Sequence, residues 1–181
     1  MDQVVTDKRT GIPGLDEVLI DGMPLNRVTL VKGPPGSGKT TFGLQFLVEG
    51  VRHGGAGIYI TLADTEREIE SFAASHGMKL DGVSILSMLP EEYLKGESQS
   101  FFRASEIELA GLSKRILDDV EQMRPSRLVL DSLSELRLSM ADETRFRRQI
   151  TAIKHVLTGL GVTTVMLEPS ATAEWIYIWK L

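Results

Sequence analysis

The chain has 181 residues, of which 42% are hydrophobic, with a formal net charge of −5 and no cysteine. This length suits one domain with a packed core. The lack of cysteine excludes disulfides, thiolate metal sites and cysteine nucleophiles. The acidic charge argues against nucleic acid as a partner, because proteins that bind DNA phosphates usually present a basic face. We find no signal peptide and no apolar run near the ~20 residues that cross a bilayer, so we expect a cytoplasmic protein without membrane contact.

Apolar runs of strand length alternate with amphipathic stretches of helix length. The predicted strands are 28–31, 58–62, 83–86, 128–131 and 162–167. The predicted helices are 40–51, 66–76, 144–160 and a long one after Ser105, which forms a capping-box spacing with Glu108; residues 90–104 read as a loop. Short apolar strands between helices are typical of a parallel sheet that is covered on both faces. The sequence therefore predicts one α/β domain over residues 1–181, without a repeat or a linker.

A glycine-rich segment follows the first predicted strand. Residues 33–40, GPPGSGKT, match the phosphate-loop pattern G-x-x-x-x-G-K-[ST]. Glycines let the backbone wrap closely around phosphates, and the free N–H groups of the next helix attract anions. Lys39 should reach the β- and γ-phosphates, and the Thr40 hydroxyl should bind Mg²⁺. A chance glycine-rich turn is the alternative, which the strand before and the helix after disfavour. We predict that ATP binds to Gly33, Pro34, Pro35, Gly36, Ser37, Gly38, Lys39, Thr40 and Thr41.

Asp131 stands at the end of the fourth predicted strand. In P-loop enzymes an acid at such a position orders Mg²⁺. An acid at a strand end can also be no more than a cap of a turn or helix. Because a phosphate loop lies upstream, we predict that Thr40 and Asp131 together hold Mg²⁺.

Residues 10–19, TGIPGLDEVL, together with the phosphate loop resemble the opening of the KaiC-like branch of RecA-type ATPases. The resemblance covers about residues 9–168 and includes ITLADT at 60–65, SEIEL at 105–109, LDSLSELR at 130–137 and GVTT at 161–164. It implies a RecA-type fold with helices on both faces of a mainly parallel sheet, in the strand order 3-2-4-5-1. It also implies a homo-oligomer, for which a hexameric ring with ATP between subunits is one form.

The first departure from the family pattern concerns hydrolysis. The family places a catalytic Glu, often one of a pair, after the second strand, whereas this chain has Ala63 and Asp64. Asp64 is therefore a candidate base on a shorter arm, with Lys39 as the other catalytic residue. A lost general base costs about 10²–10⁴-fold in rate, so we expect weak ATPase activity. The alternative is that Asp64 only caps the helix that begins near Glu66.

The second departure is the segment 169–181, which has no match in the family pattern. By family analogy the sheet would be shortened, without its usual strands beside the first strand. The aromatic and β-branched run from Trp175 to Trp179 has strong strand propensity. We expect it to pair along an exposed edge, within the subunit or with a partner, unless it packs on the core as a tail.

Several other polar residues have open roles. Ser132 and Ser134 are expected to cap or hydrogen-bond near the phosphate site, since no G-x-S-x-G motif surrounds them. The arginines at 145, 147 and 148 are interpreted as a solvated helix face. Glu168 lies near the place where a sensor of the γ-phosphate could stand.

Three functions remain open on this basis. The leading one is a KaiC-like ATPase in regulation or signalling, which binds ATP and ADP and contacts further copies of itself or a signalling protein. The second is a nucleotide-dependent switch or assembly module that does not hydrolyse ATP. The third is a recombinase-like ATPase that binds DNA.

Overall fold

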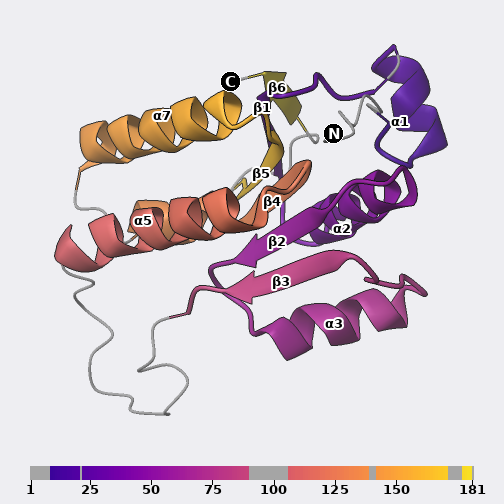
Figure 1. Cartoon of the computed structure of the whole chain (residues 1–181), viewed down its shortest axis with the longest axis horizontal. Helices are drawn as coiled ribbons and strands as arrows, with labels where there is room; N and C mark the ends of the chain where they lie inside the picture. The colour runs from indigo at the N-terminus through magenta and orange to yellow at the C-terminus, as the bar shows by residue number, and fades with distance from the viewer. Residues whose placement is uncertain (1–8, 21, 90–105, 139–141, 171–176, 181) are drawn as a thin grey trace.

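A six-stranded sheet runs through the middle of the protein (Figure 1). The structure is a computed structural model that describes residues 9–20, 22–89, 106–138, 142–170 and 177–180. The strand order is β3-β2-β4-β5-β1-β6. The strands are β1 (Val28–Gly33), β2 (Gly57–Thr61), β3 (Val83–Ser87), β4 (Arg127–Asp131), β5 (Thr163–Pro169) and β6 (Tyr177–Lys180). The first five pair in parallel, which confirms the predicted α/β class and the predicted order 3-2-4-5-1.

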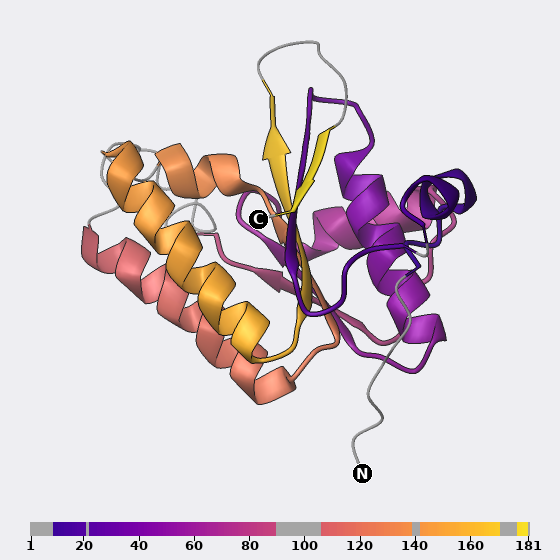
Figure 2. The same cartoon turned by 90° about the horizontal axis from the view of Figure 1, so that it is seen from above.

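Helices cover both faces of the sheet (Figure 2). One face carries α1 (Pro13–Val18), α2 (Lys39–Arg52) and α3 (Glu66–Ser75), and the other carries α5 (Glu106–Met123), α6 (Leu133–Leu138) and α7 (Glu143–Gly159). None of the helices in the described part of the chain is both long and apolar enough to cross a membrane. Buried strands between two helical layers need apolar side chains on both faces, which explains their continuous apolar runs.

Alternate residues of the central strands enter different layers of the core. Tyr59 of β2 and Val129 of β4 pack in the layer of α2 and α3. Ile58 and Leu130 pack in the layer of α5, α6 and α7. Because side chains alternate along a strand, Asp131 lies on the same face as Val129. The α2 face therefore receives the side chain at the end of β4.

The predicted helix ends agree with the structure where a glycine follows. Gly77 after α3 and Gly161 after α7 have φ of 68° and 74°, the left-handed conformation that commonly ends helices. The predicted cap Ser105 and the loop 90–104 lie outside the described residues. Two helices, α1 and α6, were not predicted, because six residues each are too few to show a helical period.

The segment 10–19 is attached to the helix that follows the phosphate loop. The Thr10 N–H and hydroxyl both donate to Asp16, each over 2.7 Å. The Gln45 side chain of α2 donates to the Gly11 carbonyl over 2.6 Å. Gly11 has φ of 79°, and a Cβ there would come within 3.0 Å of Glu49 Cβ. Close backbone approach therefore joins this segment to α2.

β6 covers the edge that family analogy left open. It pairs antiparallel with β1, with Leu30 opposite Trp179 and Val31 opposite Ile178. The expected strand in the aromatic run is confirmed, and its partner is this chain's own first strand. Trp175 and Ile176 lie outside the described residues. The phosphate-loop strand is thus paired on both sides, by β5 and by β6.

Candidate nucleotide-binding site

The phosphate loop joins β1 to α2 at the edge where the parallel strands end. Gly36 and Gly38 have φ of 77° and 84°, and no atom lies within 4 Å of a Cβ built on either. A side chain would therefore fit in space but would strain the backbone. Within the described residues, no side chain caps the start of α2. The first N–H groups of that helix are consequently suited to an anion such as phosphate.

Lys39 bends back across its own loop. Its Nζ donates to the carbonyl oxygens of Gly33 and Pro34, over 2.9 and 2.8 Å. Burial lowers the pKa of Lys39, and the nearby Asp131 charge acts in the opposite direction. A phosphate in the loop would offer the ammonium an anionic acceptor in exchange for neutral carbonyls, and hydrogen bonds between charged groups are the stronger kind.

Thr40 and Asp131 lie side by side although they are 91 positions apart in the chain. The Thr40 hydroxyl donates to Asp131 Oδ2 over 3.2 Å. These two oxygen ligands fit Mg²⁺, which usually takes one or two protein oxygens and completes its shell with waters and phosphates. In the part of the chain that the structure describes, no group of three or more acidic or histidine side chains could hold a metal alone. The donor set therefore matches a metal that arrives with a nucleotide.

Tyr59 is a member of this site that sequence reasoning missed. Its hydroxyl donates to the same Asp131 Oδ2 over 2.5 Å, although the residue is fully buried in β2. Burial, followed by the charge of Asp131, raises the pKa of Tyr59, so the hydroxyl keeps its proton. Tyr59 stands two residues before Thr61, and Thr61 pairs with Asp131 in the sheet. This position could have indicated Tyr59 only once the pairing of β2 with β4 was known.

Asp64 follows β2 at the same edge. Its backbone N–H donates to Thr61 Oγ1 over 2.9 Å. Thr65, and not Asp64, caps α3, since Thr65 and Glu68 form a reciprocal capping box. The alternative that Asp64 serves only as this cap is therefore wrong. Burial raises the pKa of Asp64, and the charges of Asp131 and Glu68 raise it further.

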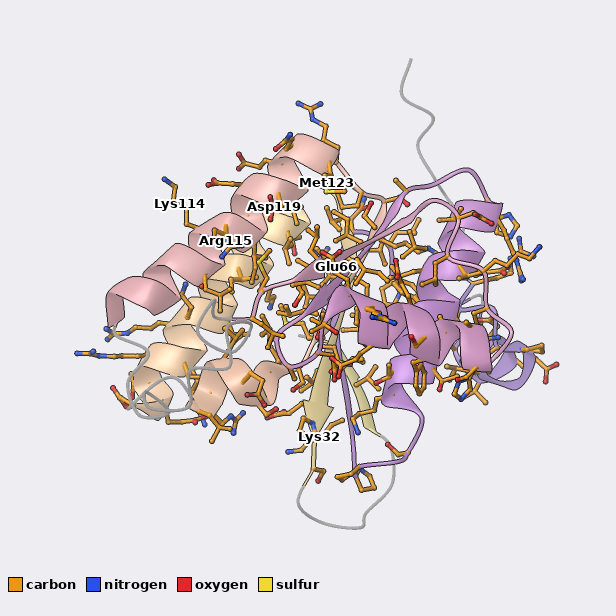
Figure 3. The ribbon with its side chains drawn as sticks, turned by 90° about the horizontal axis from the view of Figure 1, so that it is seen from below. Lys32, Glu66, Lys114, Arg115, Asp119 and Met123 are labelled. Atoms are coloured by element: carbon orange, nitrogen blue, oxygen red, sulfur yellow. The ribbon has the colours of Figure 1, made fainter. Side chains whose placement is uncertain are left out.

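Glu168 lies within β5 and is engaged by an arginine. Arg137 of α6 contacts Glu168 Oε1 over 2.7 Å, and the Arg137 guanidinium stacks over the Phe146 ring at 4.6 Å. Glu168 also lies opposite Lys32 of β1 in the sheet register. Figure 3 shows Lys32 where β1 approaches the loop. The Glu168 carboxylate is therefore paired with a guanidinium, unlike that of Asp131, which accepts from neutral hydroxyls.

The other predicted polar residues lie outside the immediate site or bond locally. Ser132 and Ser134 hydrogen-bond to each other over 2.5 Å at the start of α6. The arginines at 145, 147 and 148 are exposed on α7, and Arg147 pairs with Glu143 over 3.6 Å. Lys114 and Arg115 are exposed on α5 and share that helix with Asp119 (Figure 3). These outer helix faces carry charges of both signs.

Together the sheet order and the loop define a class of protein. The glycine loop follows β1, Lys39 and Thr40 open α2, and Asp131 ends β4. This is the arrangement of a P-loop ATPase of the RecA type.

Comparison with known proteins gives the family within that class. A family model for the KaiC ATPase matches residues 8–175, and the chain belongs to this family. Membership implies ATP binding, and members often form oligomers.

Three similar proteins show how far the likeness extends. Circadian clock protein KaiC3 of Synechocystis sp. is 31% identical over 165 residues, which cover 87% of this chain and 31% of that protein. A UPF0273 protein of Thermotoga maritima is 30% identical, with 92% and 71% of the two chains covered. The crystal structure of a KaiC-like protein from Pyrococcus horikoshii OT3 matches with a TM-score of 0.73 and 25% identity, over 92% of this chain and 71% of that one. The chain thus spans about a third of the length of the clock relative and about two thirds of the other two.

Proposed function

We propose that this domain binds ATP together with Mg²⁺ and hydrolyses it slowly, as the nucleotide-responsive part of a regulatory or signalling protein. The observation that carries the proposal is the contact between Thr40 Oγ1 and Asp131 Oδ2 over 3.2 Å, beside Lys39. It joins the phosphate loop to a carboxylate at the end of a neighbouring strand. Two similar proteins are named as circadian clock proteins, and this supports the proposed regulatory role.

Each residue of the site has a distinct task in this proposal. The loop amides and Lys39 hold the phosphates. Thr40 and Asp131 hold Mg²⁺, which when bound neutralises negative charge on the phosphate oxygens. Fixed N–H groups aimed at the phosphates need no rearrangement when charge develops during the reaction.

Asp64 is the proposed general base for hydrolysis. The oxygen of a water forms a bond to the γ-phosphorus while the bond to the bridging oxygen breaks, and ADP leaves. The proton of that water passes to the Asp64 carboxylate. The raised pKa of Asp64 makes it a stronger base than an ordinary aspartate. Its arm is one methylene shorter than that of glutamate, and misplacement near 1 Å can cost about a hundredfold, which supports a slow rate.

The binding half of the proposal is tested by charge removal. ATP with Mg²⁺ should raise the melting temperature of the wild type, since a ligand at a hundred times its Kd adds about 2.7 kcal/mol of stability. Lys39→Ala should abolish most of this increase, as measured by differential scanning fluorimetry. Lys114→Ala removes the same charge from the exposed face of α5 and should respond like the wild type. An undiminished increase in Lys39→Ala contradicts the site.

A second candidate function is a switch that binds ATP without turnover. The replacement of the family's Glu by Asp64, after Ala63, favours it. Single-turnover hydrolysis separates the two functions. If the domain is an enzyme, Asp64→Asn should lower the rate about 10²–10⁴-fold. If the wild type shows no turnover, but light scattering shows that ATP changes the molar mass of its assembly, the switch or assembly function is supported.

A further inference from the structure

We propose that Tyr59 is a positioning residue for the metal site: its buried hydroxyl fixes the Asp131 carboxylate so that it meets Thr40 in one orientation. The inference rests on the proposed binding of Mg²⁺ and ATP and adds a third protein group to that site. Tyr59 touches Asp131 and acts through it.

Within the described residues, two side chains donate to the Asp131 carboxylate, and both hydrogen bonds end on the same oxygen. Tyr59 donates to Oδ2 over 2.5 Å, and Thr40 donates to the same atom over 3.2 Å. A carboxylate has about four acceptor positions on its two oxygens, so the Oδ1 atom of Asp131 keeps capacity for a further ligand. Two donors from different elements, β2 and α2, restrict rotation of the carboxylate more than one donor can.

The sheet brings the tyrosine hydroxyl to this point. Tyr59 is paired with Val129, and Asp131 lies two residues further along β4 on the same face. Side chains in strands lean along the strand direction, so a tyrosine ring can extend over the two-residue step of about 6.6 Å. The hydroxyl thereby reaches from the core of the sheet to its carboxyl edge.

Helix α2 keeps the ring in place. Gly43 faces the ring, and a Cβ built on Gly43 would lie 3.5 Å from Tyr59 Cε2 and 3.0 Å from Val129 Cγ1. The missing side chain lets α2 lie close to the sheet over Tyr59. Tyr59, Val129 and Leu167 belong to one buried cluster beneath this helix. Protein interiors are densely packed, so the ring has little freedom to move its hydroxyl away from Asp131.

A buried tyrosine also needs a hydrogen-bond partner simply to be stable. The two roles differ in what the loss of the hydroxyl does. A group that orients a metal ligand typically changes metal affinity 10–100-fold when it is removed. A group that only satisfies the core changes stability and leaves metal affinity unchanged.

The test removes the Tyr59 hydroxyl and measures the affinity of the site for a divalent metal ion. Tyr59→Phe keeps the ring and removes only the hydroxyl. Thr164→Val is the matched control, because the Thr164 hydroxyl is also buried but lies near the start of β5, far along the strand from the edge that carries the phosphate loop. Mn²⁺ is titrated in place of Mg²⁺ into each protein with saturating ATPγS, and free Mn²⁺ is followed by electron paramagnetic resonance. ATPγS binding in EDTA is measured separately. We expect about tenfold or greater weakening of Mn²⁺ binding in Tyr59→Phe alone, with metal-free nucleotide binding unchanged.

Several results overturn the inference. Wild-type Mn²⁺ affinity in Tyr59→Phe contradicts it, and so does an equal loss in Thr164→Val or an equal loss of metal-free binding. Absence of nucleotide binding by the wild type would overturn the proposed function, and with it this inference. If Tyr59→Phe does not fold, the ¹³Cζ signal of Tyr59 in labelled wild type serves as the readout, assigned by means of Tyr93→Phe and Tyr177→Phe. That signal should shift when Mg²⁺ joins the ATP-bound protein, and an unmoved signal contradicts the inference.

Discussion

Asp131 and Glu168 stand near the ends of two adjacent parallel strands, yet they have different surroundings. Asp131 of β4 accepts hydrogen bonds from two neutral hydroxyls, those of Thr40 and Tyr59. Glu168 of β5 forms an ion pair with Arg137, and only 9% of its side chain is exposed. The difference lies in which groups contact each carboxylate, neutral hydroxyls at Asp131 and a charged guanidinium at Glu168. Neutral donors orient a carboxylate and leave its charge available to a cation, whereas a guanidinium takes that charge up.

This comparison distinguishes Asp131, which we propose binds the metal, from Glu168, which is already paired with an arginine. From the sequence, both acids were candidates for contact with the nucleotide, because both lie near strand ends. In the structure, only Asp131 faces the phosphate loop through a hydrogen bond from α2. Arg137 connects α6 to β5 instead, and it also stacks on Phe146 of α7. Glu168 is therefore expected to hold two helices against the sheet.

The largest effect is expected on metal affinity at Asp131. Asp131→Asn removes the charge that attracts the cation, so Mn²⁺ binding with ATPγS should weaken by at least about a hundredfold, beyond the range for outer groups. Glu168→Gln is the matched control, with the same loss of one charge on the next strand. It should keep wild-type affinity in the same titration. Equal weakening in both variants would mean that Glu168 also serves the metal.

A smaller effect is expected on stability at the ion pair. Arg137→Leu leaves the buried Glu168 without its cation, and the free energy of unfolding should fall by about 1–3 kcal/mol. This loss is smaller than that expected for a fully buried ion pair, because Arg137 is half-exposed. Glu168→Gln should cost less, about 1 kcal/mol, since water can reach the remaining Arg137. Urea denaturation without nucleotide measures both. If Glu168→Gln instead costs more stability than Arg137→Leu, the loss of the carboxylate destabilises the protein more than the loss of the guanidinium.

The smallest effect concerns the titration of Asp64. Its raised pKa is due first to burial, then to Asp131 and Glu68, so Asp131→Asn should lower it and Glu168→Gln should not. The Asp64 ¹³Cγ resonance of the nucleotide-free protein, followed against pH, measures this. Because the folded pKa lies above the unfolded one, the favourable contribution of Asp64 to stability is complete below the unfolded pKa and is lost as pH rises through the folded pKa.

A stability measurement completes that comparison at neutral pH. Asp64→Asn should raise the melting temperature slightly at pH 7, because the amide avoids the burial of a charge. At a pH below the unfolded pKa of aspartate, about 3.9, the two proteins should differ less. A drop in melting temperature at pH 7 would indicate that the Asp64 carboxylate stabilises the fold through a contact of its own.

The phosphate loop and its flanking elements could be predicted because their signals are local. The glycines, Lys39 and Thr40 stand in one short stretch, between an apolar strand and an amphipathic helix. Asp131 could be proposed from its place at the end of a strand, with a phosphate loop as context. The strand order came from the resemblance to a family, since periodicity alone does not say which strands are neighbours.

Tyr59 and Arg137 could not be assigned in the same way. In the sequence Tyr59 is one apolar member of a strand, GIYIT, and Arg137 lies on a helix too short to predict. Each acquires its role from a residue on another strand: Asp131 is 72 positions from Tyr59, and Glu168 is on β5. Such pairings depend on register and on the packing of α2 and α6 against the sheet.

The sequence by itself determined which groups are available to this protein: a glycine-rich loop of the phosphate-binding pattern, a hydroxyl and a carboxylate of the kind that Mg²⁺ accepts, and alternating strands and helices. These follow from residue types and short spacings, which local backbone physics can interpret. Only the tertiary structure decided how each acid near the strand ends is engaged. That choice depends on whether a neutral hydroxyl or a guanidinium lies beside the carboxylate, and residues distant in the chain supply both.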